Sequence, residues 1–149
     1  MAIGGRLTHV GICVSDMERS LRFYRGTLGF AASGAFPELR VENEAADKLL
    51  ALRGVALHAV YLERDGFRIE LLHYARPASP AVAPRRGMND LGLTHLSIRV
   101  ADLDAAMAEI ESGGGSVDRA TLVEMGGLRV AVFARDPDGL PIELVFGPS

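Results

Sequence analysis

The stretch DGFRIEL at Asp65–Leu71 occurs again, with two changes, as DGLPIEL at Asp138–Leu144. In both copies an Asp-Gly pair precedes a short run in which Glu stands between Ile and Leu. Asp-Gly favours a tight β-hairpin because glycine adopts positive φ without a steric cost, so each copy predicts a turn followed by a strand. Side chains alternate along a strand, so we expect Glu70 and Glu143 on the face opposite their apolar neighbours.

A second pair of matching stretches lies upstream of the first. LTHVGICVSDM at Leu7–Met17 matches LTHLSIRVADL at Leu93–Leu103, including Leu-Thr-His and the Val and Asp that follow. These two stretches are 86 residues apart, whereas the two Asp-Gly stretches are 73 apart, so the first repeat holds 13 more residues between its motifs. The extra length falls within Ala31–Arg53. Two motifs repeated in the same order predict two copies of one structural unit.

Each repeat predicts the element order βαβββ, and the fold class is therefore α+β. Runs rich in Val, Ile and Leu predict the strands Leu7–Val14, Val55–Glu63 and Phe67–Tyr74 in the first repeat, and Leu93–Val100, Leu128–Arg135 and Leu140–Phe146 in the second. A further strand is predicted in each, near Ala32–Val41 and near Ser116–Glu124. We predict one domain over residues 1–149, with a first module at about 5–75, a proline-rich linker at about 76–90 and a second module at about 91–147.

One helix is predicted in each repeat, directly after the first strand. Asp16 and Asp102 stand at the N-cap positions, and apolar residues then recur at helical spacing. Gly29 and the Gly113–Gly115 run predict left-handed C-terminal caps. In the longer first repeat, Ala45–Leu52 predicts an additional short helix, which either covers the mouth of a pocket or is a surface insertion without a role.

Composition narrows the functional classes. A net charge of −3 and a pI of about 5.8, without a basic stripe, argue against a nucleic-acid partner. The single cysteine, Cys13, excludes an internal disulfide and suits a reducing compartment. A secretory signal pattern is missing, and no run reaches the roughly 18 apolar residues of a membrane span. These features predict a cytoplasmic protein without a membrane partner.

Two histidines and two glutamates occupy equivalent positions in the two repeats. Alternation places His9 on the polar face of its strand and His95 on the polar face of the matching strand. A lone His or Glu on a strand is more often a solvated or hydrogen-bonded residue, but four such residues at matching positions favour a metal site. Imidazole and carboxylate donors suit one divalent ion, Ni, Zn, Co, Mn or Fe, and leave coordination positions for water or substrate.

The stretch LTHVGICVSDMERSLRFYRGTLGF, with the second strand-His and DPDGLPIEL, resembles the vicinal oxygen chelate superfamily. This superfamily contains glyoxalase I, methylmalonyl-CoA epimerase, extradiol dioxygenases, and bleomycin- and fosfomycin-resistance proteins. The resemblance covers nearly the whole chain. It implies two βαβββ modules that form a U-shaped, partly open mixed sheet around a metal, in a homodimer.

The resemblance also implies a ligand set. His9, Glu70, His95 and Glu143 match the four metal ligands in order, and bacterial-type glyoxalase I has this His-Glu-His-Glu pattern. Methylmalonyl-CoA epimerases usually have Gln at the position of Glu70, and extradiol dioxygenases use only the equivalents of His9, His95 and Glu143. The first module is longer than in most glyoxalases I, and the linker is closer to that of the epimerases.

The leading hypothesis is a glyoxalase I-like (lactoylglutathione lyase-like) lyase or isomerase that acts on a small molecule with oxygens on adjacent carbons. The metal would stabilise an enediolate, with Glu143 as the base and Glu70 as its symmetry-related alternative. A methylmalonyl-CoA epimerase-like isomerase is an alternative that uses the same chemistry.

Two other classes stay open. An Fe-dependent extradiol-type dioxygenase would need a further acid or base, for which His58, Tyr61 and Tyr74 are available by type, whereas His73 falls on the face opposite Glu70. In a non-catalytic binding or resistance protein, a pocket would simply hold the ligand. In every class the residues predicted to line the pocket are Arg99, Cys13, Phe133, Met125 and Phe36.

Overall fold

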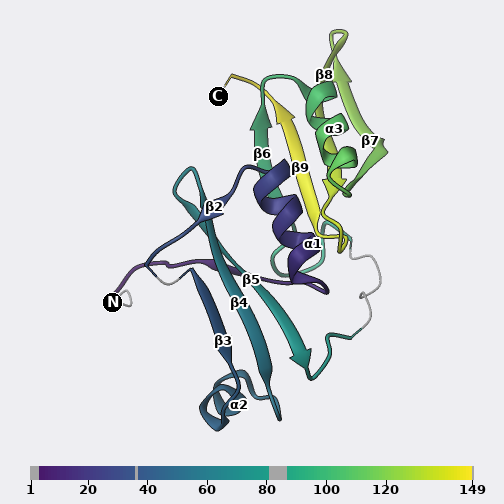
Figure 1. Cartoon of the computed structure of the whole chain (residues 1–149). Helices are drawn as coiled ribbons and strands as arrows, with labels where there is room; N and C mark the ends of the chain where they lie inside the picture. Colours follow the sequence, from purple (N-terminus) through teal and green to yellow (C-terminus); the bar gives the residue numbers. More distant parts are fainter. Residues whose placement is uncertain (1–3, 36, 81–86, 149) are drawn as a thin grey trace. The chain divides into compact units, whose positions relative to one another are not determined.

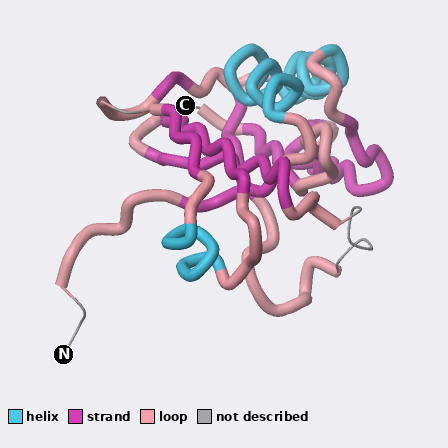
Figure 2. Tube along the Cα trace, turned by 60° about the horizontal axis from the view of Figure 1, so that its bottom comes forward, coloured by secondary structure: helices cyan, strands magenta, loops and turns pink. Residues whose placement is uncertain are grey.

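The fold consists of two open, mixed β-sheets with a few short helices, which confirms the predicted α+β class (Figures 1 and 2). The computed structural model describes residues 4–35, 37–80 and 87–148. The chain divides into two compact units. The first comprises the N-terminal segment to Glu18 with Gly29–Ser79, and the second comprises Arg19–Leu28 with the chain from Pro80 onward.

The first sheet has the order β1-β5-β4-β2, and β3 also pairs with β4. Strands β1 and β5 pair in parallel, and the other pairs are antiparallel. Asp65 and Gly66 both have positive φ between β4 and β5, as a two-residue hairpin turn requires, so the predicted Asp-Gly turn is confirmed. The strands are β1 (Val10–Cys13), β2 (Ala31–Ala32), β3 (Glu38–Val41), β4 (Ala56–Arg64) and β5 (Phe67–Arg76).

The second sheet repeats this topology with the order β6-β9-β8-β7. Strands β6 and β9 pair in parallel, as β1 and β5 do, so the strands of the two sequence repeats are arranged equivalently. Gly126 and Gly127 form a second two-residue hairpin turn. The strands are β6 (Leu96–Val100), β7 (Ser116–Met125), β8 (Leu128–Arg135) and β9 (Pro141–Phe146).

Strand boundaries differ most from the predictions next to the two histidines and in the longer first repeat. β1 begins at Val10 and β6 at Leu96, so each histidine directly precedes its strand instead of lying within it. The predicted strand near Ala32–Val41 is two short strands, β2 and β3, each paired with a different part of β4. Glycine and proline between them interrupt the ladder, because Pro37 cannot donate a backbone hydrogen bond.

The helices follow the sequence signals. α1 (Met17–Leu21) continues as a π-helical segment, η1 (Arg22–Thr27), and the chain leaves it through Gly29 at φ 69°. α2 (Glu44–Leu50) is the predicted extra helix, and Asn43 caps its N-terminus by accepting from the backbone N–H of Ala46 at 2.9 Å.

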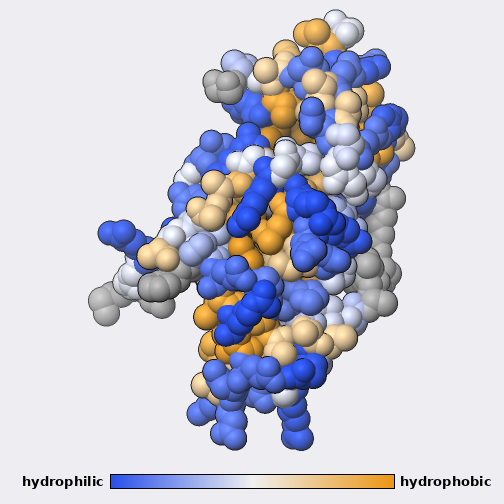
Figure 3. All heavy atoms as spheres, viewed as in Figure 1, coloured by the Kyte–Doolittle hydropathy of each residue, from blue (hydrophilic) through white to orange (hydrophobic). Residues whose placement is uncertain are grey.

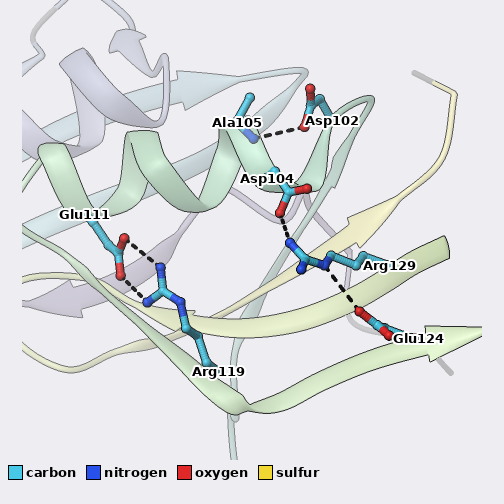
Figure 4. A network of polar contacts seen from close by, with 7 residues as sticks. All are labelled: Asp102, Asp104, Ala105, Glu111, Arg119, Glu124 and Arg129. Atoms are coloured by element: carbon cyan, nitrogen blue, oxygen red, sulfur yellow. Dashed lines mark hydrogen bonds and ion pairs between the residues drawn. The ribbon is translucent and has the colours of Figure 1, made fainter. Parts of the chain in front are cut away.

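The helix α3 (Leu103–Ser112) is capped by Asp102, as predicted, and the positive φ follows one residue after its C-cap, at Gly114. Ion pairs join α3 to strands β7 and β8 of its sheet (Figure 4). Arg129 on β8 contacts Asp104 and Glu124, and Arg119 on β7 contacts Glu111. All these groups are exposed and screened by solvent, so the ion pairs contribute little to stability.

The first helix groups with the second sheet's unit. Tyr24 is fully buried, and its hydroxyl donates to Asp136 at 2.9 Å in the β8–β9 turn, while Arg19 forms an ion pair with Asp138 in the same turn. The FYR stretch and the DPDG stretch are therefore contact partners within the second unit. Asp136 also accepts from two backbone N–H groups, which fixes the turn from which β9 begins.

Burial confirms the alternation predicted for the two Asp-Gly strands. Ile69 and Leu71 are fully buried on β5, and Ile142 and Leu144 have at most 2% exposure on β9. The glutamate between each pair is only partly buried, on the opposite face. Each sheet thus has an apolar face that belongs to the core and a second face that carries polar groups.

Candidate functional site: two histidine–glutamate pairs

Each unit brings one predicted histidine against one predicted glutamate. In the first unit, His9 Nε2 lies 3.0 Å from Glu70 Oε2. In the second, His95 Nε2 lies 3.7 Å from Glu143 Oε2. Both contacts result from the parallel pairing of β1 with β5 and of β6 with β9. Val10, the residue after His9, pairs with Ile69, the residue before Glu70, and the second unit has the equivalent pairing.

The second ring nitrogen of each histidine contacts the preceding threonine. Thr8 Oγ1 is 3.0 Å from His9 Nδ1, and Thr94 Oγ1 is 2.8 Å from His95 Nδ1. When Nδ1 carries the proton, it donates to the hydroxyl and leaves the Nε2 lone pair directed at the glutamate. A hydrogen-bonded Nδ1 with a free Nε2 is the usual arrangement of a metal-ligating histidine. The repeated Leu-Thr-His is the sequence signal for this contact.

An aromatic ring lies edge-on to each histidine. The Tyr61 ring centroid is 5.2 Å from that of His9, and the Phe133 centroid is 5.4 Å from that of His95. Both aromatic residues pair directly across the sheet with the glutamate of their unit. Phe133, which was predicted to line a pocket, lies beside His95 and Glu143.

Two hydroxyl groups contact the glutamates, and we did not predict either contact from the sequence. Tyr61 hydrogen-bonds to Glu70, and this contact, together with burial, raises the pKa of Tyr61 to about 12. Ser97 Oγ donates to Glu143 Oε2 at 2.8 Å. The signal for Ser97 was its place opposite Glu143 on the neighbouring strand, on the same face as His95.

The other predicted pocket residues are placed as follows. Cys13 shares the face of Glu70, two residues along β1 from Gly11, and its Sγ lies 3.3 Å from Ser79 Oγ. Arg99 shares the face of Glu143 and lies two residues along β6 from Ser97, the partner of Glu143. Met125 lies at the hairpin end of β7 and is 66% exposed, and no contact between described residues brings it to His95 or Glu143. Phe36 lies outside the described residues.

The two other histidines of the chain, His58 and His73, do not lie on the face that carries Glu70. His58 pairs with His73 across β4 and β5, one register step away from the pairing of Leu57 with Tyr74. Strand alternation therefore places both histidines opposite the face of Glu70. His58 Nε2 lies 2.8 Å from a Glu38 carboxylate oxygen, which is an ion-pair contact at the sheet edge.

The donor chemistry fits a divalent metal. Each unit directs one imidazole nitrogen and one carboxylate oxygen toward each other, and these are ligands for Zn, Ni, Co, Fe or Mn. Among residues 4–35, 37–80 and 87–148, no group of three or more His, Cys, Asp and Glu side chains is close enough to hold an ion. A single unit thus offers two donors, and a four-ligand site requires both pairs.

Comparisons with known proteins agree with this repeat architecture. Residues 6–144 match the model of the "Glyoxalase/Bleomycin resistance protein/Dioxygenase superfamily". The chain belongs to this superfamily. A probable lactoylglutathione lyase of Vibrio parahaemolyticus serotype O3:K6 is 31% identical over 144 residues, covering 95% of this chain and 90% of the relative. Human mitochondrial methylmalonyl-CoA epimerase is 30% identical over 107 residues, covering 72% of this chain and 53% of the relative.

The solved structures show the same glyoxalase fold. A glyoxalase family protein from Bacillus cereus superposes with a TM-score of 0.77 at 22% identity, and covers 98% of this chain and 97% of its own. Within the described part of the chain, helices are too short or too polar to cross a membrane.

Proposed function

We propose that this superfamily member is a metal-dependent lyase or isomerase of the glyoxalase I type, acting on a small molecule with oxygens on adjacent carbons. The observation that carries the proposal is the pair of His–Glu contacts, one in each unit, at 3.0 and 3.7 Å. Each histidine also has a threonine hydroxyl at Nδ1 and an aromatic ring edge-on to its imidazole, and both contacts orient Nε2 toward the glutamate.

The ligands in this proposal are His9, Glu70, His95 and Glu143, all bound to one divalent ion. Such an ion supplies a positive charge that stabilises the negative charge developing on the substrate oxygens when a neighbouring C–H proton is removed. Thr8 and Thr94 hold the imidazoles with Nε2 available. The ion is Ni, Zn, Co, Mn or Fe.

Glu143 is the proton acceptor in this proposal. Its side chain is 31% exposed, whereas that of Glu70 is 14% exposed, and it lies further from its histidine. A carboxylate that takes a proton from carbon has to reach the substrate, and the more exposed glutamate has more freedom to do so. Glu70 is the alternative base.

The substrate in this proposal carries a negative charge away from the reacting carbons. Arg99 is exposed on the face of Glu143, and no ion pair joins it to another described residue. A guanidinium without a carboxylate partner on this face can bind a carboxylate or phosphate of the substrate. Phe133 and Cys13 would line the less polar part of the pocket.

An epimerase acting on an acyl-CoA thioester is the second candidate, favoured by the 30% identity to human methylmalonyl-CoA epimerase. It requires the same removal of a proton next to a carbonyl group, so the roles proposed for the residues are unchanged. The glyoxalase I type ranks first because a glutamate, Glu70, stands in the first His–Glu pair.

We further propose a cytoplasmic homodimer. Apolar side chains reach the surface in patches, shown in orange in Figure 3. Several large ones are more than half exposed and are available for a subunit contact: Leu7, Leu49, Leu91, Leu93, Met125 and Leu128.

The test begins with elemental analysis of the protein purified without chelators. It continues with an assay on the hemithioacetal of methylglyoxal and glutathione, and on a racemisable acyl-CoA thioester. The proposal expects a bound divalent metal and metal-dependent turnover of one of these substrates. Turnover that survives complete removal of metal would refute it.

A further inference from the structure

The two His–Glu pairs differ in the group that hydrogen-bonds the glutamate. In the first unit the donor is Tyr61, which pairs with Glu70 across β4 and β5 and also packs its ring edge against His9. Gly11, on the other side of Glu70 in the sheet, has no side chain. A Cβ at this glycine would lie 3.2 Å from the tip of Leu72, so the position is closely packed.

In the second unit a different residue occupies each of these two positions. Phe133 takes the place of Tyr61, with its ring edge-on to His95 at 5.4 Å, but it has no hydroxyl. Ser97 takes the place of Gly11 and donates to Glu143 at 2.8 Å from the opposite neighbouring strand. Each glutamate thus has a hydroxyl donor, but the donors are a phenol in one unit and a serine in the other.

The two donors restrain a carboxylate to different degrees. The phenol is held by a rigid ring that contacts His9, so its oxygen has one position relative to the sheet. A serine hydroxyl turns about one short torsion and can follow or release a moving carboxylate. The contacts agree with this difference, since Glu70 is less exposed than Glu143 and lies 0.7 Å nearer to its histidine (3.0 against 3.7 Å).

We propose that Tyr61 is a positioning residue that holds Glu70 as a fixed metal ligand, and that Phe133 and Ser97 leave Glu143 able to move. The exchange of donors makes two otherwise equivalent glutamates unequal. This inference rests on the proposed metal-dependent function, and deepens it by assigning the difference between the glutamates to two specific sequence changes.

The chain supplies its own matched variants for the test. Tyr61→Phe copies the second unit into the first, and Phe133→Tyr copies the first into the second, each by a single oxygen atom. The dissociation constant for Co²⁺ is measured by isothermal titration calorimetry on metal-free protein, and the visible absorption spectrum of the Co²⁺ form reports its coordination. Thermal unfolding of each metal-free variant shows that it is folded.

Tyr61→Phe is expected to weaken Co²⁺ binding about ten-fold or more and to change the visible spectrum, because a lost outer hydrogen bond frees the ligand. Phe133→Tyr is expected to tighten Co²⁺ binding and to lower kcat with little change in KM, because the new phenol restrains Glu143. Ser97→Gly, which copies Gly11, is expected to weaken Co²⁺ binding less than Tyr61→Phe does.

The outcomes separate the two proposals. If folded Tyr61→Phe binds Co²⁺ as tightly as the wild type and has the same spectrum, the positioning role is overturned. The proposed metal site is then unaffected. Wild-type protein that binds no Co²⁺ would overturn the proposed function together with this inference. If Tyr61→Phe does not fold, an unchanged spectrum and affinity in Phe133→Tyr would likewise overturn the positioning role.

Discussion

Replacing Tyr24 by Phe removes one oxygen atom from the contact that joins the first helix to the β8–β9 turn. The hydroxyl donates to Asp136 Oδ2 at 2.9 Å, and the two residues are 0% and 3% exposed. Asp136 Oδ1 keeps its two backbone donors, from Asp138 and Leu140, so only Oδ2 loses a partner. The position bears on the proposed site because β9, which carries Glu143, starts from this turn.

The expected loss follows from the burial of that oxygen. A buried hydrogen bond to a charged group contributes roughly 1.5–3 kcal/mol, and water cannot replace it here. We expect Tyr24→Phe to lower the free energy of unfolding by about 2 kcal/mol, which corresponds to about 4–8 °C in Tm for a chain of this size. Tyr74→Phe removes a hydroxyl from a half-buried position on β5 and is the matched control, with an expected loss under about 0.5 kcal/mol.

The loss should also depend on pH. Burial raises the pKa of Asp136 in the folded protein, and the hydrogen bond from Tyr24 opposes this rise. A raised folded-state pKa contributes stability that is complete at low pH and is lost as pH rises through that pKa. Without the Tyr24 hydroxyl the pKa rises further, so the difference between variant and wild type should grow with increasing pH and shrink as Asp136 becomes protonated.

Urea unfolding followed by circular dichroism, at about pH 7.5 and about pH 4.5, measures this difference directly. A Tyr24→Phe variant as stable as the wild type at the higher pH would refute the reasoning. So would a loss that keeps the same size as the pH is lowered further, until Asp136 is protonated, because it would not involve the ionised carboxylate.

Three further predictions concern the base, a cap and a packed glycine. Glu143→Gln should keep its metal and lose about 100-fold or more in kcat, measured by metal analysis and steady-state kinetics, and full activity would exclude Glu143 as the base. Asp102→Ala should lower the free energy of unfolding by about 1 kcal/mol through the lost N-cap of α3, as read from urea unfolding. Gly115→Ala should lower Tm strongly, because its Cβ would lie 2.5 Å from the carbonyl oxygen of Arg135, whereas Gly26→Ala, with nothing within 4 Å, should leave Tm unchanged or raise it.

The repeated motifs predicted most of the fold. The two Asp-Gly strands and the two Leu-Thr-His stretches gave the element order, the hairpin turn at Asp65-Gly66 and the faces of both glutamates. These features depend on local chemistry, namely glycine at positive φ and alternation along a strand, and a single sequence carries that information.

The sequence did not predict which of the two units the first helix belongs to. The apolar stripe that includes Leu21 and Tyr24 predicts a buried helix face, but it does not indicate which sheet covers that face. The answer depends on a contact 112 residues apart, from Tyr24 to Asp136, and each of these residues alone has an ordinary explanation in its own motif.

The sequence predicted the site residues at which the two repeats match and missed the contacts at which the repeats differ. His9, Glu70, His95 and Glu143 were found because the repeats agree at these positions. The hydroxyl contacts were missed because they come from positions where the repeats disagree. Comparing the repeats for compensating changes, with Tyr against Phe and Gly against Ser, would have found them.

Metal content is the most direct test of the proposed function. The protein is purified without chelators, and Ni, Zn, Co, Mn and Fe are measured by plasma mass spectrometry in wild type, His9→Ala and His95→Ala. We predict about one divalent ion for each set of four ligands in the wild type, and loss of most of that metal in both variants, because each removes a ligand from a different repeat. Wild-type protein without metal that takes up none of these ions, or variants that keep the full amount, would contradict the account.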